Sequence, residues 1–291
     1  MDMSMYQLLA NKTDQHPELT GENGLAIPFL GLAGEVGELL TEYKKRLRDG
    51  AKHTLFIEKV KEELGDILWY IANTSSKLGI RLQDVAEANI KKTHDRWANV
   101  SEVSGGWKPF DEIFPESEQF PRKFIAKMEE SMDHGTPKVA LTVDGKQLGS
   151  QIDDNSYVDD GYRYHDAFHL AHLAVMHWSP VIRAFMRRKR KSIPEVDVVE
   201  DGARAIFTEE AVTAFIYGNA INSNYFQGVA PDFELLKTVR VLVAPYEVRV
   251  RTTGDWERAI QEGYAAFLRL RRNRGGLIEV DMVARSLKVI E

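Results

Sequence analysis

Cysteine, an excess of positive charge and a long hydrophobic run are all missing from this chain. With no cysteine among its 291 residues, the chain cannot form disulfides or bind a metal through thiolates. The 38 lysines and arginines are outnumbered by 44 aspartates and glutamates, and the net charge of −6 argues against nucleic acid as a general partner. No basic segment precedes an apolar stretch at the N-terminus, and no run approaches the ~18 apolar residues of a membrane span. We therefore expect a cytoplasmic protein with no membrane partner.

The chain contains enough apolar residues for a substantial core, since 43% of its residues are hydrophobic. In the first hundred residues the apolar positions recur with the period of an α-helix, interrupted by turn-forming segments. This pattern predicts helices over residues 3–14, 26–48, 55–78 and 82–97. A stretch rich in Gly, Pro and Ser follows and predicts a boundary, with one domain over residues 1–110 and a second over 120–291.

The second domain mixes helical and strand-like patterns. Asp144-Gly145 lies between two short strand-like runs and predicts a hairpin, and another hairpin is predicted after Gly275-Gly276. Helical patterns lie between these hairpins, over residues 161–179, 181–190, 208–222, 232–243 and 254–272. The predicted fold class is therefore mostly α, with an N-terminal helical bundle followed by an α-rich domain with short β-hairpins.

A stripe of carboxylates accompanies the apolar face of the second predicted helix. Glu35, Glu38 and Glu42 gather with Lys45 beside an apolar face that we expect to be buried, formed by Val36, Leu39, Leu40, Tyr43 and Leu47. In the third helix Glu63 and Asp66 also border the apolar face, whereas Glu62 points further toward solvent. If these two helices are antiparallel neighbours, Glu35, Glu38, Glu63 and Asp66 can converge.

Such convergence requires neutralisation, because two unit charges about 4 Å apart repel by roughly 4 kcal/mol at an effective dielectric constant of about 20. The stripe offers only oxygen ligands, and these select a hard cation such as Mg²⁺, which keeps several waters and binds substrate phosphates. The alternative is a solvated helix edge whose glutamates pair with Lys44, Lys45 and Arg46. Spacing alone leaves both interpretations open.

Three motifs in this region carry a family resemblance. GEVGEL at 34–39 and EELGDILW at 62–69 resemble the paired ExxE and ExxD motifs of the MazG family, the all-α nucleoside triphosphate pyrophosphohydrolases. ANIKKTHDRW at 88–97 is similar to the Asn/Lys/Arg segment that follows in that family. The resemblance covers residues 24–98 and favours the metal site over the solvated edge.

The resemblance implies roles for individual residues. Glu35, Glu38, Glu63 and Asp66 would bind Mg²⁺, with Mn²⁺ as an alternative, and Glu38 would also serve as a base. A second group would approach the phosphates of a nucleoside triphosphate, namely Lys45, Asn89, Lys92 and Arg96. Water would attack the α-phosphorus and release pyrophosphate and a nucleoside monophosphate. The resemblance also implies a homodimer or larger homo-oligomer, since single MazG modules commonly complete their bundle by pairing.

Two other functions remain open at this point. In the first, the chain is a non-catalytic sensor that binds Mg-nucleotide and signals through its C-terminal domain. In the second, the C-terminal domain is a metal-dependent hydrolase and the MazG module supplies assembly. The preferred base and sugar are not predicted, because they depend on the shape of a pocket.

Three histidines of the second domain fall on one helical face, His165, His169 and His172. Imidazoles at i and i+4 can share a metal, yet the sequence does not identify the remaining ligands. We expect structural histidines that bond to neighbouring carboxylates. The alternatives are a transition-metal site and a histidine-aspartate phosphohydrolase built on His165-Asp166. An acidic helix with Glu209 and Glu210 could face the histidines.

The second domain as a whole, from DDGYRYHDAFHLAH to NRGGLIEVD, resembles the C-terminal domain that accompanies MazG domains in one bacterial branch. This resemblance implies no chemistry. Within the domain, residues 187–191 form a basic run at the end of a predicted helix. We expect the run to be solvated, with a phosphate or nucleic-acid contact as the alternative.

Overall fold

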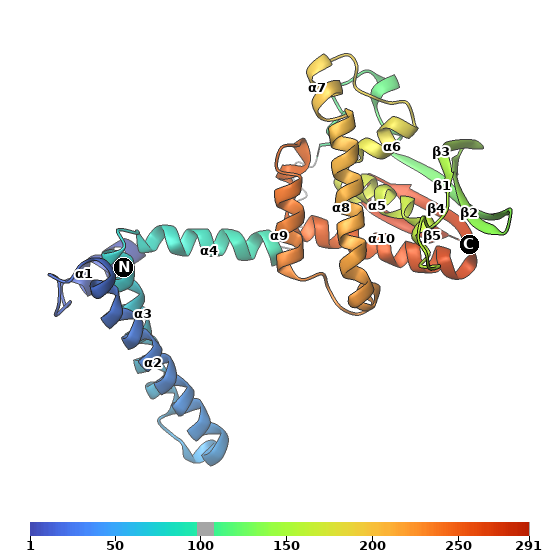
Figure 1. The fold of residues 1–291 in the computed structure, drawn as a ribbon. Helices are drawn as coiled ribbons and strands as arrows, with labels where there is room; N and C mark the ends of the chain where they lie inside the picture. The colour runs from blue at the N-terminus through green and yellow to red at the C-terminus, as the bar shows by residue number, and fades with distance from the viewer. Residues whose placement is uncertain (98–107, 291) are drawn as a thin grey trace. The chain divides into compact units, whose positions relative to one another are not determined.

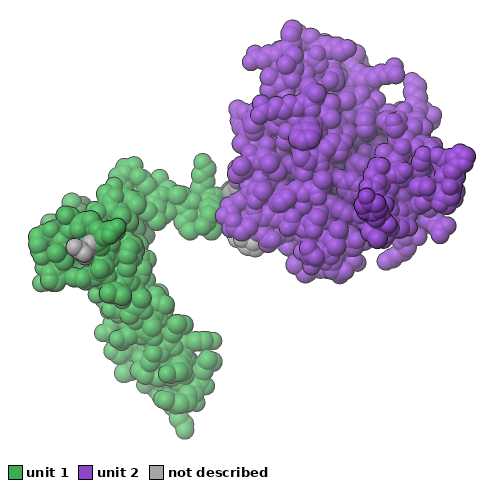
Figure 2. Space-filling view, in the orientation of Figure 1, with its two compact units in different colours: residues 1–94 green, residues 95–291 purple. Residues whose placement is uncertain are grey.

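The computed structural model describes the backbone of residues 1–97 and 108–290, and the side chains of these residues except 23 and 95–97. The chain divides into two compact units, residues 1–94 and residues 95–291 (Figure 2).

Unit 1 is helical, as its apolar spacing predicts. Its helices are α1 (Met3–Asn11), α2 (Gly21–Asp49), α3 (Phe56–Lys77) and α4 (Leu82–Trp97). All the helices predicted for this region are confirmed, with ends that differ by up to five residues. A short turn at Gly50–Lys52 reverses the chain, so that α2 and α3 form an antiparallel hairpin (Figure 1). This is the arrangement that the convergence of the carboxylates requires.

The buried core of unit 1 is small. Among its described residues, the buried apolar side chains are Ala10, Ala72 and Leu82, with Tyr6, Trp69 and Ile71 packed against them. The apolar face of α2, which the sequence predicts to be buried, is largely exposed, with Leu40 at 61% and Leu47 at 69%. The expectation of burial is wrong for the single chain, because a helical hairpin has only one internal contact surface.

Helix α2 also overlaps a segment, Gly24–Lys52, that is long and apolar enough by composition to cross a membrane. This finding qualifies the sequence-based expectation of no membrane partner. Core helices of soluble proteins have the same composition, so the segment does not assign a location to the protein.

Unit 2 is built around a five-stranded antiparallel sheet in the order β3-β2-β1-β4-β5. Its strands are β1 (Lys123–Asp133), β2 (Thr136–Val143), β3 (Lys146–Ile152), β4 (Gly275–Asp281) and β5 (Ser286–Ile290). Both predicted hairpins are confirmed, and positive φ values of 50° at Asp144 and 72° at Gly145 form the turn between β2 and β3. Strand β1 was not predicted. It pairs with both β2 and β4 and thereby joins the two hairpins into one sheet.

The helices of unit 2 pack on this sheet and on one another. They are α5 (Asp166–Met176), α6 (Pro180–Phe185), α7 (Pro194–Val199), α8 (Ala203–Asn222), α9 (Phe233–Leu242) and α10 (Thr253–Asn273). Every residue of α5 is buried, because α10 and the sheet flank it and α8 covers a further side (Figure 1). Gly263 of α10 permits the close approach to α5, since a Cβ atom there would lie 3.2 Å from atoms of Ala171 and Phe168.

One residue of the basic run after α6, Arg190, is part of the interior. The predicted helix over 181–190 ends at Phe185, and Arg187 adopts a positive φ of 57°. Arg190 is only 1% exposed, and its Nη2 donates to Asp201 Oδ1 and Glu247 Oε1, both at 2.7 Å. The expectation of a solvated run is therefore wrong for Arg190, whose charge is compensated within the chain.

Candidate functional site

Three of the predicted metal-binding carboxylates come together across the α2–α3 hairpin. Glu35 of α2 and Glu63 and Asp66 of α3 each offer an oxygen, and these oxygens lie within 4.8 Å of one another. The i, i+3 spacing places Glu63 and Asp66 on one side of their helix, facing Glu35. Glu38 is exposed and lies outside this group of three. We refer to Glu35, Glu63 and Asp66 as the carboxylate cluster.

Glu63 is the least exposed member of the cluster. Its relative exposure is 7%, whereas Glu62 is exposed and accepts a hydrogen bond from Lys59 Nζ at 2.7 Å. Burial, followed by the negative charges of Glu38 and Glu35, raises the pKa of Glu63. Glu38 therefore acts on the cluster electrostatically from outside the group. The predicted difference in exposure between Glu62 and Glu63 is confirmed.

No lysine or arginine forms an ion pair with the carboxylate cluster among the residues that the structure describes. Lys59 pairs with Glu62, and Lys45 pairs with Glu42. A buried carboxylate beside other carboxylates is unfavourable unless a cation accompanies it. A donor set made only of oxygen atoms fits a hard divalent cation such as Mg²⁺.

The residues predicted to bind phosphate are not brought to the cluster within one chain. Lys45 bonds to the buried Glu42, which also contacts His53 Nε2 at 2.8 Å, a partner that the sequence did not reveal. Asn89 and Lys92 lie on the exposed part of α4, and no described contact joins them to the carboxylates. The side chain of Arg96 lies outside the described residues.

A cavity of about 210 Å³ lies between the loop that joins α1 to α2, the beginning of α2 and the second half of α3. Trp69, Tyr70 and Asn73 of α3 line one wall of this cavity, and Ile27 of α2 lines another. Tyr70 follows Asp66 by one helical turn, so one end of the cavity lies about one turn from Asp66 on the same face of α3. Its mixture of aromatic and amide side chains is suited to a planar polar ligand.

In unit 2, two of the three predicted histidines share one buried carboxylate. Glu209 Oε1 accepts from Nδ1 of His169 at 3.0 Å and of His172 at 3.1 Å. Glu209 Oε2 accepts from the Ser179 hydroxyl at 3.0 Å and from the Val181 amide at 2.9 Å. Burial would raise the pKa of Glu209, but the charge and hydrogen bonds of the histidines lower it to about 2. Helix α8 thus faces the histidine helix, as the sequence suggested.

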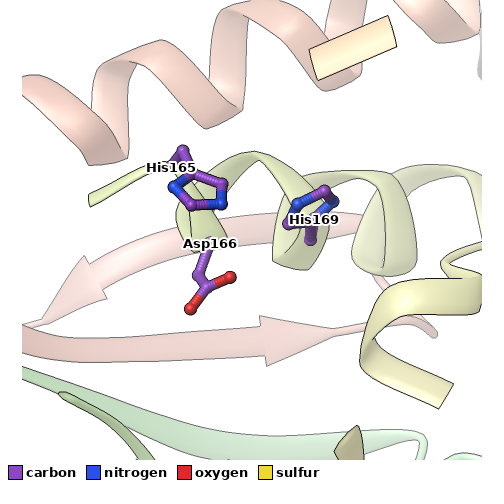
Figure 3. A group of neighbouring side chains, drawn as sticks. All are labelled: His165, Asp166 and His169. Atoms are coloured by element: carbon purple, nitrogen blue, oxygen red, sulfur yellow. The ribbon is translucent and has the colours of Figure 1, made fainter. Parts of the chain in front are cut away.

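His165, the third predicted histidine, forms a second group with Asp166 and His169. The ligand atoms of His165, Asp166 and His169 lie within 4.8 Å of one another (Figure 3). Glu210 Oε2 is 3.3 Å from His169 Nε2 and 3.8 Å from His165 Nε2. This second constellation therefore contains two imidazoles and two carboxylates, drawn from α5, its preceding turn and α8.

Comparison with known families assigns each of the two parts of the chain to a domain family. Residues 28–101 match the model of the MazG nucleotide pyrophosphohydrolase domain, and residues 105–291 match that of the MazG C-terminal domain. The chain belongs to the MazG family. The carboxylate cluster lies in its MazG domain, and the histidine constellation lies in its MazG C-terminal domain.

A curated relative of this MazG-family chain is the "Gene 37 protein" of Mycobacterium phage L5. The two are 33% identical over 101 residues, which cover 33% of this chain and 89% of the phage protein. No solved structure matches the chain.

Proposed function

We propose that the chain hydrolyses nucleoside triphosphates to nucleoside monophosphates and pyrophosphate in a Mg²⁺-dependent reaction. One observation carries this proposal: within a MazG nucleotide pyrophosphohydrolase domain, three carboxylates lie within 4.8 Å of one another with no described lysine or arginine paired to them. The Mg²⁺ ion that accompanies a nucleoside triphosphate supplies the positive charge that this cluster lacks.

Within this proposal, Glu35, Glu63 and Asp66 hold the cation, and Mn²⁺ can replace Mg²⁺. When bound, the metal neutralises charge on the carboxylates and the triphosphate and favours ionisation of the attacking water. Glu38, which is exposed and close enough to influence Glu63, is the fourth carboxylate of the set and the base that accepts the proton of that water.

The cavity beside the cluster is our proposed position for the nucleobase. A base that lies against Trp69 and Tyr70 would stack on an aromatic side chain, and the buried Asn73 amide would contact its polar edge. The triphosphate would then extend along the α2–α3 seam toward Asp66. Asn89, Lys92 and Arg96 remain the proposed phosphate-binding residues, with Lys45 engaged by Glu42.

We further propose that a second copy of the chain covers the exposed face of α2, giving a homodimer or larger homo-oligomer. This face consists of large apolar side chains, including Val36 at 41% exposure, Leu40 at 61% and Leu47 at 69%. Contiguous apolar surface of this kind is typical of a protein interface. A partner also provides a route by which α4 residues reach a carboxylate cluster.

The proposed reaction is tested by incubating the purified full-length chain with a panel of canonical and modified nucleoside triphosphates. Pyrophosphate and monophosphate should appear in equal amounts with Mg²⁺ or Mn²⁺, and neither should appear when EDTA is in excess. Release of orthophosphate in place of pyrophosphate would exclude the proposed reaction. Tight nucleotide retention without turnover would instead indicate a sensor.

A further inference from the structure

We propose that unit 2 contains a second metal site, for a divalent transition-metal ion such as Zn²⁺. Its ligands are Nε2 of His165, Nε2 of His169 and the carboxylates of Glu210 and Asp166. We refer to these four residues as the histidine–carboxylate site. The site is separate from the carboxylate cluster and does not depend on the proposed pyrophosphohydrolase activity.

The hydrogen bonds of the two imidazoles leave the correct nitrogen available. His165 Nδ1 lies 2.9 Å from the carbonyl oxygen of Tyr162, which can only accept, so Nδ1 carries the proton. His169 Nδ1 lies 3.0 Å from Glu209, whose carboxylate likewise accepts. Metal binding requires the neutral form of each ring, in which the lone pair is on Nε2. Metal-binding histidines are held in this way, with the second nitrogen donating to a carboxylate or carbonyl group. Burial disfavours the protonated form of His169, but the charges of Glu209 and Glu210 raise its pKa, so a metal ion must displace a proton from this ring.

The two Nε2 atoms are turned toward one carboxylate oxygen. His169 is fully buried, and within the described part of the chain its Nε2 makes no hydrogen bond, yet it lies 3.3 Å from Glu210 Oε2. His165 Nε2 lies 3.8 Å from the same oxygen. Ligand atoms at about 2.0–2.1 Å from a tetrahedral Zn²⁺ are roughly 3.3 Å apart. The distances from Glu210 Oε2 to the two nitrogens are therefore close to those around one ion, and the side chains must move closer together for all of them to bind it.

Asp166 places a carboxylate beside the two imidazoles. Its side chain is buried, at 5% exposure. One of its oxygens lies within 4.8 Å of one ring nitrogen of His165 and one ring nitrogen of His169 (Figure 3). A buried carboxylate is costly unless a positive charge accompanies it, and a bound cation would supply that charge.

The neighbouring group of His169, His172 and Glu209 is not the metal site, although its atoms are equally close together. Both oxygens of Glu209 already accept two hydrogen bonds each, from the two histidines and from Ser179 and Val181. Glu209 therefore positions His169, and His172 completes the same network. This assignment divides the three predicted histidines between a structural role and a binding role.

The composition of the site selects its metal. Two imidazoles with carboxylates favour first-row transition ions such as Zn²⁺, Fe²⁺ or Mn²⁺, whereas Mg²⁺ and Ca²⁺ prefer sites made of oxygen atoms. The side chain of Glu210 is 39% exposed, so an ion can enter from solvent on that side. The same opening leaves room for water in a remaining coordination position.

The test uses the full-length chain, stripped of metal with a chelator and then titrated with Co²⁺ in excess Mg²⁺. Wild-type protein should bind one Co²⁺ per chain with a visible absorption band, and Zn²⁺ should displace it. Glu210→Gln and His165→Gln change partly exposed side chains, and each should weaken Co²⁺ binding by at least ~10-fold. Glu195→Gln, an exposed change on α7, is the matched control and should leave binding unchanged.

A parallel titration of Glu63→Ala separates the two proposed metal sites, since this variant should retain the Co²⁺ band. The proposal is overturned if wild-type protein binds no Co²⁺ with a visible band. It is also overturned if the band disappears in Glu63→Ala, or if it persists unchanged in both Glu210→Gln and His165→Gln. His169→Ala is a poor probe, because this fully buried residue also supports the fold through Glu209.

Discussion

The two units differ in how far they bury their apolar side chains and pair their buried charges. Unit 2 has an extensive core, with fully buried side chains that include Trp178, Trp256 and Phe267. Its buried Arg190 is matched by Asp201 and Glu247. Unit 1 exposes the apolar face of α2, and no ion pair to its buried Glu63 occurs among the described residues. Unit 2 is therefore largely self-sufficient, whereas unit 1 presents a carboxylate cluster and an apolar face that the proposed cation and the proposed second copy would cover.

The largest effect is expected when the buried member of the carboxylate cluster is removed. Glu63→Ala should abolish Mg²⁺-dependent pyrophosphate release, because the proposed metal site loses its most buried ligand. Glu62→Ala is the control, since Glu62 is exposed and pairs with Lys59, and it should cost less than about threefold. Steady-state rates of pyrophosphate release by the two variants measure this difference. Equal losses would place the metal elsewhere on α3.

A second substitution concerns the carboxylate outside the cluster. Glu38→Gln should lower turnover by at least ~10²-fold, in the range that follows removal of one electrostatic group from an active site. The variant should fold, because the exposed Glu38 adds to the repulsion around Glu63. Circular dichroism would check folding alongside the rate. Wild-type turnover in folded Glu38→Gln protein would exclude a role for this side chain.

The stability of unit 2 should depend on pH through the titration of His177. Burial, assisted by the positive charges of Arg251 and Arg285, lowers the pKa of His177 to about 4. The neutral ring is therefore favoured in the folded state, and this contribution to stability is present above pH ~6.5 and is lost as pH falls toward 4. The loss should be about 3 kcal/mol.

Hydrogen exchange of the α5 amides would measure this loss specifically in unit 2, because these amides open with its core. His177→Gln removes the titrating group and retains a donor for the carbonyl of Met282, which His177 Nε2 contacts at 2.7 Å. The protection of α5 in this variant should depend less on pH. An identical pH dependence in both proteins would contradict the assignment to His177.

The proposed interface can be tested by placing one aspartate on an exposed apolar position of each unit and measuring self-association. Leu40→Asp on α2 should weaken self-association at least ~10-fold, because it places a charge in the proposed interface. Val241→Asp on α9 changes a side chain of similar exposure, 73% against 61%, and should leave the assembly unchanged. Light scattering after size-exclusion chromatography would report the mass. A monomeric wild-type protein would refute the proposed interface.

The smallest expected effect is a pH-dependent stabilisation of unit 1 by Mg²⁺. The pKa of Glu63 is raised, so its contribution to stability is complete below the ordinary glutamate pKa and is lost as pH rises through the raised value. Metal-free protein should therefore become less stable as pH rises through this range, and Mg²⁺ should restore stability above it by a few degrees in Tm. Glu63→Gln should melt independently of Mg²⁺ over the same pH range.

The helical pattern of unit 1 and the convergence of its carboxylates are local properties, and they could be predicted. The i, i+3 spacing fixes the face of each helix, and the short connection between α2 and α3 makes them neighbours. The exposure of Leu40 and Leu47 could not be predicted, because apolar spacing shows which face should be buried and not what buries it.

Long-range contacts account for most of what was missed in unit 2. Strand β1 does carry an alternating signal, since Phe124, Ala126 and Met128 are buried between exposed neighbours, but charged residues interrupt the apolar pattern. The pairing of His169 with Glu209 and Glu210 joins residues about forty positions apart. The spacing of the three histidines along the sequence places them on one face of a helix. Only the packing of α8 on α5 shows which carboxylates contact them.

Hydrolysis in ¹⁸O-labelled water tests most directly whether this MazG-family chain cleaves nucleoside triphosphates at the α-phosphorus. With Mg²⁺ present, the label should appear in the nucleoside monophosphate and not in pyrophosphate, because water becomes bonded to the α-phosphorus. Mass spectrometry of the separated products gives the answer in a single turnover experiment. Label found in pyrophosphate or orthophosphate would contradict the proposed reaction.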